Sequence, residues 1–325
     1  MRPNWLTKLF TAACVAGAFM ATPAAAKNVK FAYALSTSSH YGAGAAAFVE
    51  TLEAELPGKF TVEQFPNSAL GGEREVLEGL QLGTIDMAVV STGATVNFVP
   101  ATGVFDIPFL FRDLSHARGV LDGEIGQNLL AEFSKRGLVG LAWSEQGFRQ
   151  LTNNERPVVT PADAKGLKVR TMENPVHIAA FRELGILATP MAWPEVATAL
   201  QQGTIDGQEN PMSVIVSAKL PQLQKYLSLT SHVYGPAVVL ASPATYGSLS
   251  KEEKAAFQKA ADAAAVAMRA YVDNVEQSGI EEVKKAGMEV NEVDHAAFSK
   301  ALDPIYPQYY KQFGQELVES IRNAQ

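Results

Sequence analysis

The chain has 325 residues, of which 47% are hydrophobic, and a formal net charge of -7. An acidic surface of this kind makes nucleic acid and anionic membranes poor partners. The one cysteine, Cys14, lies in an N-terminal segment that has the pattern of a cleaved signal peptide. We therefore predict no disulfide, zinc-thiolate site or cysteine nucleophile in the mature chain.

The N-terminus has the pattern of a secretory signal peptide. Arg2 and Lys8 precede an apolar run over residues 9–21, and small residues follow up to Ala26. The run is about 13 residues long, whereas a membrane-spanning helix needs roughly 20. Too little apolar sequence precedes Cys14 for a lipoprotein signal. We therefore predict that residues 1–26 are a cleaved signal peptide and that the protein is periplasmic.

Strands and helices are predicted to alternate along the first part of the mature chain. Period-two patterns indicate strands, and apolar residues at helical spacing indicate helices, the first of which Ser39 caps. The predicted order is strand 29–35, a helix from about 41 to 56, strand 60–65, helix 73–82 and strand 85–90. This alternation predicts an α/β fold with a largely parallel sheet.

The remaining chain continues the same alternation and then becomes helical. Ser250 and Glu253 have the spacing of a capping box, which opens a long Ala-rich helix reaching about residue 285. The other predicted elements are strands 138–143 and 167–170, helix 175–184, strand 237–241 and a single C-terminal helix over 306–321. A helix as long as 250–285 is able to span two lobes.

One sequence repeat supports a two-lobed architecture. Residues 80–86 read LQLGTID, and residues 200–206 read LQQGTID, in each case as a helix, a glycine cap and the start of a strand. We predict two similarly built lobes with a cleft between them, joined by short hinge crossings. The predicted boundaries are 27–147 plus about 236–275 for lobe I, and 148–235 plus about 276–325 for lobe II.

Arg170 is the first candidate for ligand binding. It follows Val169 at the carboxyl end of a predicted strand, where open α/β sheets bind ligands. A guanidinium there offers a planar pair of donors to a carboxylate. Taken alone, an arginine in this place is also compatible with a solvated surface charge.

Six motifs, in order along the chain, resemble the extracytoplasmic solute-binding proteins of tripartite ATP-independent periplasmic (TRAP) transporters, the DctP-like family. The likeness covers essentially the whole mature chain and includes the sequences GFRQ, GLKVR and GQENP. The six motifs are residues 68–74, 80–86, 147–150, 166–170, 190–196 and 200–211.

The resemblance implies roles for individual side chains. Arg170 matches the carboxylate-clamping arginine of the family, Arg149 a second arginine that assists it, and Asn210 an amide that bonds ligand oxygens. Trp193 matches an aromatic wall of the cleft, although it is also suited to core packing before Pro194. The resemblance further implies that the small side chains of Ser91, Thr92 and Gly93 line the cleft from the first lobe.

Two further residues are weaker candidates. His40 precedes the first helix and is placed to reach the cleft, although isolated histidines mostly lie on the surface or in satisfied core positions. Tyr234, before Gly235 and Pro236, is equally suited to hinge packing and to ligand contact.

The function implied is capture of a small organic acid by lobe closure and its delivery to TRAP membrane permease subunits. We expect the protein to act as a monomer and to bind no nucleic acid, metal or cofactor. A C4-dicarboxylate, a sugar acid and a 2-oxo or hydroxy acid all remain open as ligands. A periplasmic enzyme is an alternative, but the five histidines have no metal-site spacing and no GxSxG motif is present.

Two competing hypotheses concern the transport partner and a cofactor. Service to an ABC importer or to a sensor kinase would use the same fold. Residues 42–47 fit the loose pattern GxGxxA, but they lie too far from the preceding strand for a dinucleotide site, and we interpret them as small residues for helix packing.

Overall fold

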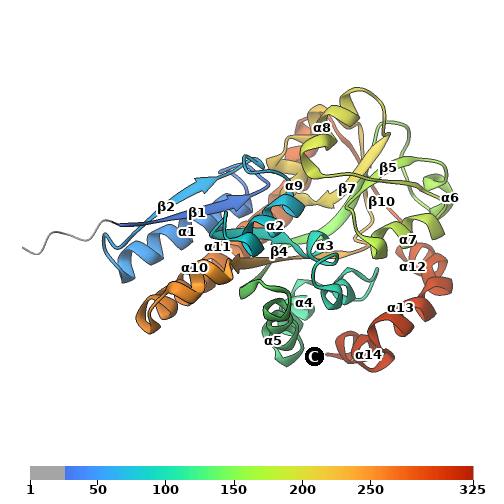
Figure 1. Cartoon of the computed structure of the whole chain (residues 1–325). Helices are drawn as coiled ribbons and strands as arrows, with labels where there is room; N and C mark the ends of the chain where they lie inside the picture. The colour runs from blue at the N-terminus through green and yellow to red at the C-terminus, as the bar shows by residue number, and fades with distance from the viewer. Residues whose placement is uncertain (1–25, 325) are drawn as a thin grey trace, which may run out of the picture.

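A computed structural model describes residues 26–324, so the predicted signal peptide lies outside the described residues except for Ala26. The strands form a ten-stranded sheet whose main order is β2-β1-β3-β9-β4-β7-β5-β6, with β8 and β10 branching from β4 (Figure 1). The strands are β1 (Lys27–Tyr33), β2 (Phe60–Phe65), β3 (Met87–Ser91), β4 (Val139–Asn153), β5 (Lys168–Thr171), β6 (Leu187–Pro190), β7 (Gly207–Pro211), β8 (Tyr226–Leu229), β9 (Tyr234–Ala241) and β10 (Glu289–Glu292).

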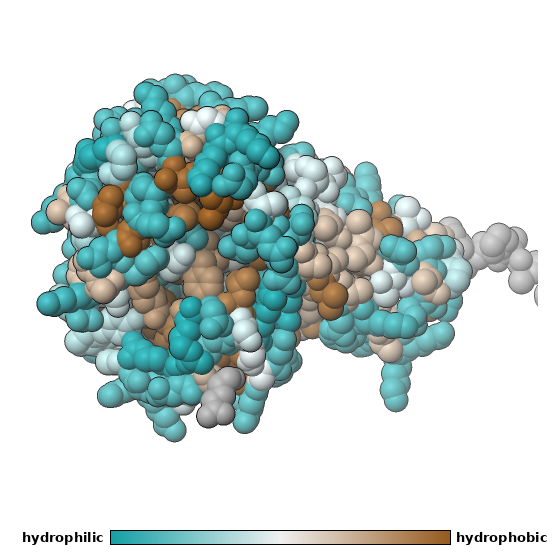
Figure 2. Space-filling view, turned by 180° about the vertical axis from the view of Figure 1, so that it is seen from behind, coloured by the Kyte–Doolittle hydropathy of each residue, from teal (hydrophilic) through white to brown (hydrophobic). Residues whose placement is uncertain are grey.

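Helices cover both faces of this sheet. They are α1 (His40–Glu55), α2 (Glu73–Leu82), α3 (Thr92–Thr95), α4 (Leu114–Asp122), α5 (Glu124–Ala131), α6 (Pro161–Ala164), α7 (Pro175–Glu183), α8 (Trp193–Gln201), α9 (Met212–Ser217), α10 (Pro243–Ser248), α11 (Lys251–Lys285), α12 (His295–Leu302), α13 (Tyr306–Phe313) and α14 (Gln315–Asn323). Four short 3-10 helices are η1 (Pro100–Asp106), η2 (Glu132–Arg136), η3 (Leu220–Gln222) and η4 (Asp303–Ile305). On the face shown in Figure 2, hydrophilic side chains project outward and hydrophobic colours gather in the hollows between them.

The α/β prediction is confirmed, but the sheet is mixed rather than largely parallel. Strand β1 pairs in parallel with β2 and β3, and β5 pairs in parallel with β6 and β7. Between these groups, β4 and β9 run antiparallel to each other and to their outer neighbours. Strand β4 continues ten residues beyond the predicted end at Trp143, through a polar stretch whose side chains are buried between the two groups.

The two groups of strands define the two lobes, the first built on β2-β1-β3 and the second on β6-β5-β7. Strand β4 changes partners between them, because its residues up to Phe148 pair with β9 and those from Arg149 onward pair with β7 and β8. In Figure 1 it runs between the two groups. The sequence boundaries of the lobes remain a prediction.

The repeated motif has the same structure in both lobes. Gly83 and Gly203 both adopt left-handed backbone conformations, at φ 74° and 67°, just beyond α2 and α8. The aspartate that ends each motif accepts a hydrogen bond from a backbone N–H of the neighbouring strand. Lys30 N donates to Asp86 Oδ2 at 2.8 Å, and Lys168 N donates to Asp206 Oδ2 at 2.7 Å.

Alternation along the strands of the first lobe builds a core on each face of the sheet. Phe31 and Tyr33 of β1 pack toward α1 and α11, whereas the intervening Ala32 packs toward α2 and η1. Small residues of α1 allow close packing on α11, because a Cβ added to Gly44 would lie 2.7 Å from Met268 Cγ. The interpretation of residues 42–47 as a packing surface agrees with this contact.

Helix α11 joins the cores of the two lobes. Its 35 residues begin at the predicted capping box, in which Ser250 and Glu253 exchange backbone and side-chain hydrogen bonds. Its first half packs through alanines on α1, and Val275 and Val283 near its end pack with α8, α9 and β8 of the second lobe.

The single C-terminal helix predicted over 306–321 is wrong. The chain forms α13 and α14, which are separated at Gly314, where φ is 88°. Only glycine enters this backbone region without strain, so the helical pattern on both sides of it could not continue through it. Tyr309 Oη donates to the Val176 carbonyl oxygen of α7, and Arg112 donates to the carbonyl oxygens of Arg322 and Ala324.

We predict that Asp86→Ala lowers the free energy of unfolding by about 1–3 kcal/mol, because Lys30 N and the Thr245 hydroxyl both lose their acceptor. Urea denaturation measures this change. Glu50→Ala, which removes an exposed carboxylate from α1, is the control and should leave the midpoint unchanged. Equal midpoints for Asp86→Ala and the parent would show that the repeated aspartate does not stabilise the strand pair.

Candidate functional site

A cavity lies between the two lobes, with about 310 Å³ of empty space when the open solvent at its mouth is included. The first lobe and its crossings contribute the ends of β1 and β3, the start of α2 and part of β4. The second lobe contributes the ends of β5 and β7 and the start of α8. The residues lining the cavity are Ala34, Leu35, Tyr41, Glu73, Ser91, Gln146, Arg170, Met172, Trp193, Asn210 and Val214.

Arg170 is the only basic side chain of this lining. It is 4% exposed, and burial lowers its pKa to about 10, so the guanidinium remains charged at neutral pH. Nε and Nη2 donate to the Met191 carbonyl oxygen at 3.0 and 2.8 Å. Nη1 makes no hydrogen bond with residues 26–324. One edge of the guanidinium is therefore held by the backbone, which leaves the other edge available for an anion.

Glu73 is the acidic counterpart in the lining, and sequence reasoning did not single it out. It opens α2, and Ser91 N donates to its Oε1 at 2.6 Å across the lobe. Burial raises the pKa of Glu73 to about 7, although the bond from Ser91 and the charges of Arg170 and Arg149 act in the opposite direction. Near neutral pH this carboxyl group can therefore donate or accept a hydrogen bond in the cavity.

Asn210 lines the cavity and is oriented by its neighbours. Its Oδ1 accepts a hydrogen bond from Arg149 Nη2 at 3.1 Å, and its Nδ2 donates to Gln208 Oε1. Strand β4 pairs with β7 so that Gln150 lies opposite Asn210. This register places Arg149, the residue before Gln150, beside Asn210.

Arg149 lies behind this amide and is absent from the lining of the cavity. It is 1% exposed, and both Nε and Nη2 donate to the carboxylate of the buried Glu209. Burial by itself would raise the pKa of Glu209, but Arg149 and the bond from His232 hold that pKa well below its usual range. The structure thus gives Arg149 a charge partner and makes it a support for Asn210. Direct ligand contact by Arg149 stays a prediction.

Trp193 and Ser91 lie on the wall of the cavity, as their predicted roles require. Trp193 is the first residue of α8, and the guanidinium carbon of Arg170 lies 5.8 Å from its ring centroid. Ser91 ends β3, where its Oγ also accepts a hydrogen bond from Gly93 N at 3.3 Å.

Thr92, Gly93 and His40 do not line the cavity. The Thr92 hydroxyl is buried and bonds to the Pro236 carbonyl oxygen at 3.4 Å, because α3 turns it into the crossing. Gly93 lies behind the lining, and the side chain of Met172, which does line the cavity, rests on Gly93. His40 is fully buried between Tyr41 and Tyr271, neither of its ring nitrogens forms a hydrogen bond with residues 26–324, and burial lowers its pKa to about 3.

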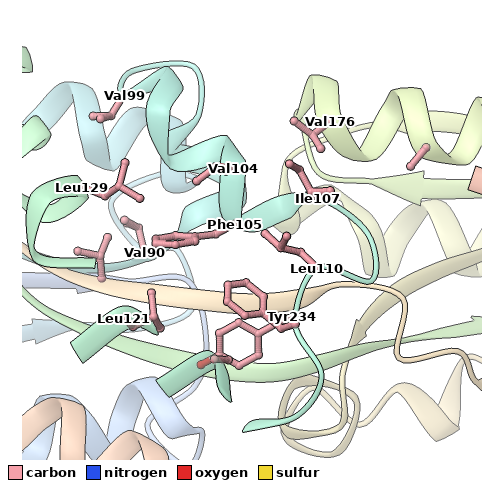
Figure 3. Close-up of a cluster of buried hydrophobic side chains, with 14 of the residues drawn as sticks. Val90, Val99, Val104, Phe105, Ile107, Leu110, Leu121, Leu129, Val176 and Tyr234 are labelled. Carbon is pink, nitrogen blue, oxygen red and sulfur yellow. The ribbon is translucent and has the colours of Figure 1, made fainter. Parts of the chain in front are cut away.

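Tyr234 is also away from the cavity and packs at the crossing between the lobes. It lies in an apolar cluster with Phe105 and Leu110 (Figure 3). Its hydroxyl donates to Glu145 Oε2 at 2.6 Å, and Arg118 Nε donates to the same carboxylate at 3.1 Å. Of the two roles predicted for Tyr234, its surroundings favour hinge packing.

The repeat carried a signal that would have found Glu73. Applying its offset of 120 residues to Trp193 gives position 73, so the two side chains open equivalent helices and face the same cavity. Tyr41 and Gln146 gave no such signal. They meet only in the fold, where Gln146 Nε2 donates to the Tyr41 hydroxyl at 2.7 Å.

Residues 26–324 contain neither a cluster of metal-ligating side chains nor a helix suited to span a membrane. Within this part of the chain, three or more His, Cys, Asp or Glu side chains nowhere gather as metal ligands would. No helix among the same residues has the length and apolar character that crossing a bilayer requires.

Comparison with protein families identifies one match over most of the chain. The model of the DctP family, described as bacterial extracellular solute-binding protein, family 7, matches residues 31–312.

Solved structures and a curated relative agree with this match. A TRAP periplasmic solute-binding protein from Bordetella bronchiseptica, with ligand density interpreted as pantoate, is 69% identical, with a TM-score of 0.91 over 92% of this chain and 99% of that one. One from Polaromonas sp. JS666, bound to D-erythronate, is 50% identical with the same TM-score and coverage. The 2,3-diketo-L-gulonate-binding periplasmic protein of Escherichia coli K12 is 40% identical over 88% of this chain and 87% of its own.

We predict that Arg149→Ala lowers the free energy of unfolding of the ligand-free protein by about 3–5 kcal/mol, since it leaves the buried Glu209 carboxylate without its main partner. Urea denaturation at pH 8 measures the loss. The double variant Arg149→Met/Glu209→Gln removes both charges and should recover most of the stability. A single variant as stable as the parent would contradict the assigned pairing.

We predict that Glu73→Gln stabilises the ligand-free protein more at pH 8 than at pH 5. The folded-state pKa is raised, so between the ordinary glutamate range and about 7 the folded state holds a proton that the unfolded state releases. Raising the pH through this window removes stability from the parent but not from the variant. Melting temperatures at pH 5, 6, 7 and 8 measure the difference.

The control for this pH series is Glu75→Gln, which changes an exposed carboxylate two residues further along α2. Its melting temperature should follow that of the parent at every pH. An offset between Glu73→Gln and the parent that does not change with pH would show that the Glu73 pKa is ordinary.

Proposed function

The chain belongs to the DctP family, family 7 of the bacterial extracellular solute-binding proteins, and we propose that its ligand is a short hydroxylated monocarboxylate, bound at Arg170. One observation carries the proposal. A buried arginine faces the interlobe cavity with one edge of its guanidinium fixed by Met191 and the other free. A carboxylate that leaves water needs a paired cation to offset its lost hydration, and this free edge supplies one.

The charges of the cavity favour one carboxylate over two. Arg170 is its one basic lining residue, and Arg149 behind it is already neutralised by Glu209. A second carboxylate would lie near Glu73 with no cation beside it. Hydroxyl groups, in contrast, can donate to the ionised Glu73 carboxylate and bond to Asn210 and Ser91.

The ligands named for three relatives that are 40% or more identical to this chain support this class, whereas succinate and other C4-dicarboxylates are named for relatives that are 30–32% identical. Pantoate and D-erythronate each carry a single carboxylate with a hydroxyl group on the neighbouring carbon. 2,3-Diketo-L-gulonate also has one carboxylate on a hydroxylated chain. A ligand of this kind has an anionic end for Arg170 and a neutral polar end for the rest of the cavity.

Closure of the lobes completes the site in this proposal. The carboxylate docks on the second lobe, and Glu73 and Ser91 of the first lobe then close over the hydroxylated end. Polar contacts between the lobes accompany the closed form beside the cavity. Asn174 Nδ2 donates to Asp106 Oδ2 at 2.9 Å, and Asn97 Nδ2 donates to the Glu173 carbonyl oxygen at 2.6 Å.

The family is one of periplasmic binding receptors that work with TRAP permeases. We infer from it that this chain is cleaved after about Ala26, acts in the periplasm as a monomer, and releases its ligand unchanged to a TRAP permease.

We predict that Arg170→Ala weakens binding of pantoate and D-erythronate at least about a hundredfold, because the buried anion loses its charge partner, a cost of about 3–5 kcal/mol. Isothermal titration calorimetry at pH 8, where Glu73 is ionised, measures the loss. Arg170→Lys keeps the charge but not the planar pair of donors, so its affinity should lie between those of the parent and Arg170→Ala. At this pH the parent should bind both acids more tightly than succinate.

Arg182→Ala is the control for this series, since it removes an exposed arginine on α7 of the same lobe and should leave both affinities unchanged. Retention of parental affinity by Arg170→Ala would refute the anion site. Tighter binding of succinate than of either hydroxy acid by the parent would refute the proposed ligand class.

A further inference from the structure

The interlobe cavity adjoins a second, larger space. This outer opening has about 960 Å³ of empty volume, open solvent included, and its mixed lining combines the polar side chains of Arg74, Glu78 and Asn97 with apolar ones such as Phe98 and Met191. Four residues line both spaces and so form the boundary between them: Glu73, Arg170, Met172 and Trp193. A ligand that extends from the cavity into the outer opening must pass these four side chains.

Met172 is the member of this boundary that crosses from one lobe to the other. It follows β5 of the second lobe and is 6% exposed. Its sulfur lies 3.8 Å from Ser91 Oγ of the first lobe. A Cβ added to Gly93 would lie 2.5 Å from the same sulfur and 2.9 Å from the terminal methyl carbon. The missing side chain at Gly93 therefore makes the space in which Met172 rests.

The other three boundary residues are each held in position by a contact of their own. Arg170 is bound to Met191, Glu73 is bound to Ser91 N, and Trp193 packs against Arg170 at the start of α8. Met172 has no strong polar partner among the described residues, and its unbranched side chain fills whatever gap it is given. Its contribution to the boundary is steric.

Resting on the proposed function, we propose that Met172 is a specificity determinant that limits the chain length of the bound acid. With Met172 seated on Gly93, the cavity accepts a short acid whose carboxylate pairs with Arg170. A shorter side chain at 172 joins the cavity to the outer opening, where Arg74, Glu78 and Asn97 offer hydrogen-bonding groups to the additional hydroxyl groups of a longer sugar acid.

The experiment measures binding of D-erythronate, a four-carbon acid, and D-galactonate, a six-carbon acid, by calorimetry at pH 8. We expect the parent to favour D-erythronate by about tenfold or more, and Met172→Ala to reduce this preference by about tenfold or more. Met172→Leu, which keeps an apolar side chain of similar size, should retain the parental preference. Should Met172→Ala fail to fold, Met172→Val is measured in its place.

Gly93→Ala tests the seat of Met172. Its added methyl group collides with the Met172 sulfur whichever acid is present, so it should weaken binding of both D-erythronate and D-galactonate. An unchanged preference in the folded Met172→Ala or Met172→Val variant would overturn the inference. An equal loss of affinity for both acids in that Met172 variant would also overturn it, because Met172 would then be a closure contact only.

The two proposals fail in different measurements. If the parent protein binds neither hydroxy acid, the proposed ligand class fails and the chain-length inference falls with it. If the parent binds D-erythronate and only the variants miss their expected ratios, the ligand class stands and the role of Met172 is refuted.

Discussion

The site depends on an unequal division of charge between two buried arginines. Arg149 is paired with Glu209, and this pair is satisfied within the protein. Arg170 has a backbone carbonyl oxygen as its hydrogen-bond acceptor but no carboxylate among residues 26–324 bonded to it. A buried positive charge without an anionic partner is costly, and an entering carboxylate removes that cost. The pair of Arg149 and Glu209 therefore supports the framework, and Arg170 is the group to which the proposed function assigns anion binding.

Strand β7 makes this division possible. Its consecutive residues Gln208, Glu209 and Asn210 alternate across the strand and are all buried. Glu209 neutralises Arg149, while Asn210 faces the cavity with its amide fixed by Arg149 and Gln208. Removing Arg149 would therefore disturb the cavity indirectly, through the orientation of Asn210, as well as leave the buried Glu209 carboxylate without its charge partner.

The duplicated architecture places different chemistry at equivalent positions. Asp86 and Asp206 perform the same structural task in the two lobes, and Gly83 and Gly203 end equivalent helices. The helices that lead into these motifs begin with Glu73 in one lobe and Trp193 in the other, and both side chains face the cavity. The shared backbone keeps the two lobes similar, and the divergence at the helix starts gives one wall a carboxyl group and the other an aromatic ring.

Local signals in the amino-acid sequence were enough to predict α2 and β2 at their observed bounds, the capping box of α11 and the repeated helix-to-strand motif. The strand pattern also placed Arg170 at a strand end, and family resemblance predicted that Asn210, Trp193 and Ser91 line the cleft. Which of the predicted residues share one cavity depends on contacts that form only in the folded chain. Pairing of β4 with β7 places Arg149 against Glu209, packing buries His40, and the contact between the lobes places Met172 on Gly93. None of these contacts leaves a periodic pattern in the chain, because the partners lie far apart in sequence and meet only through the fold.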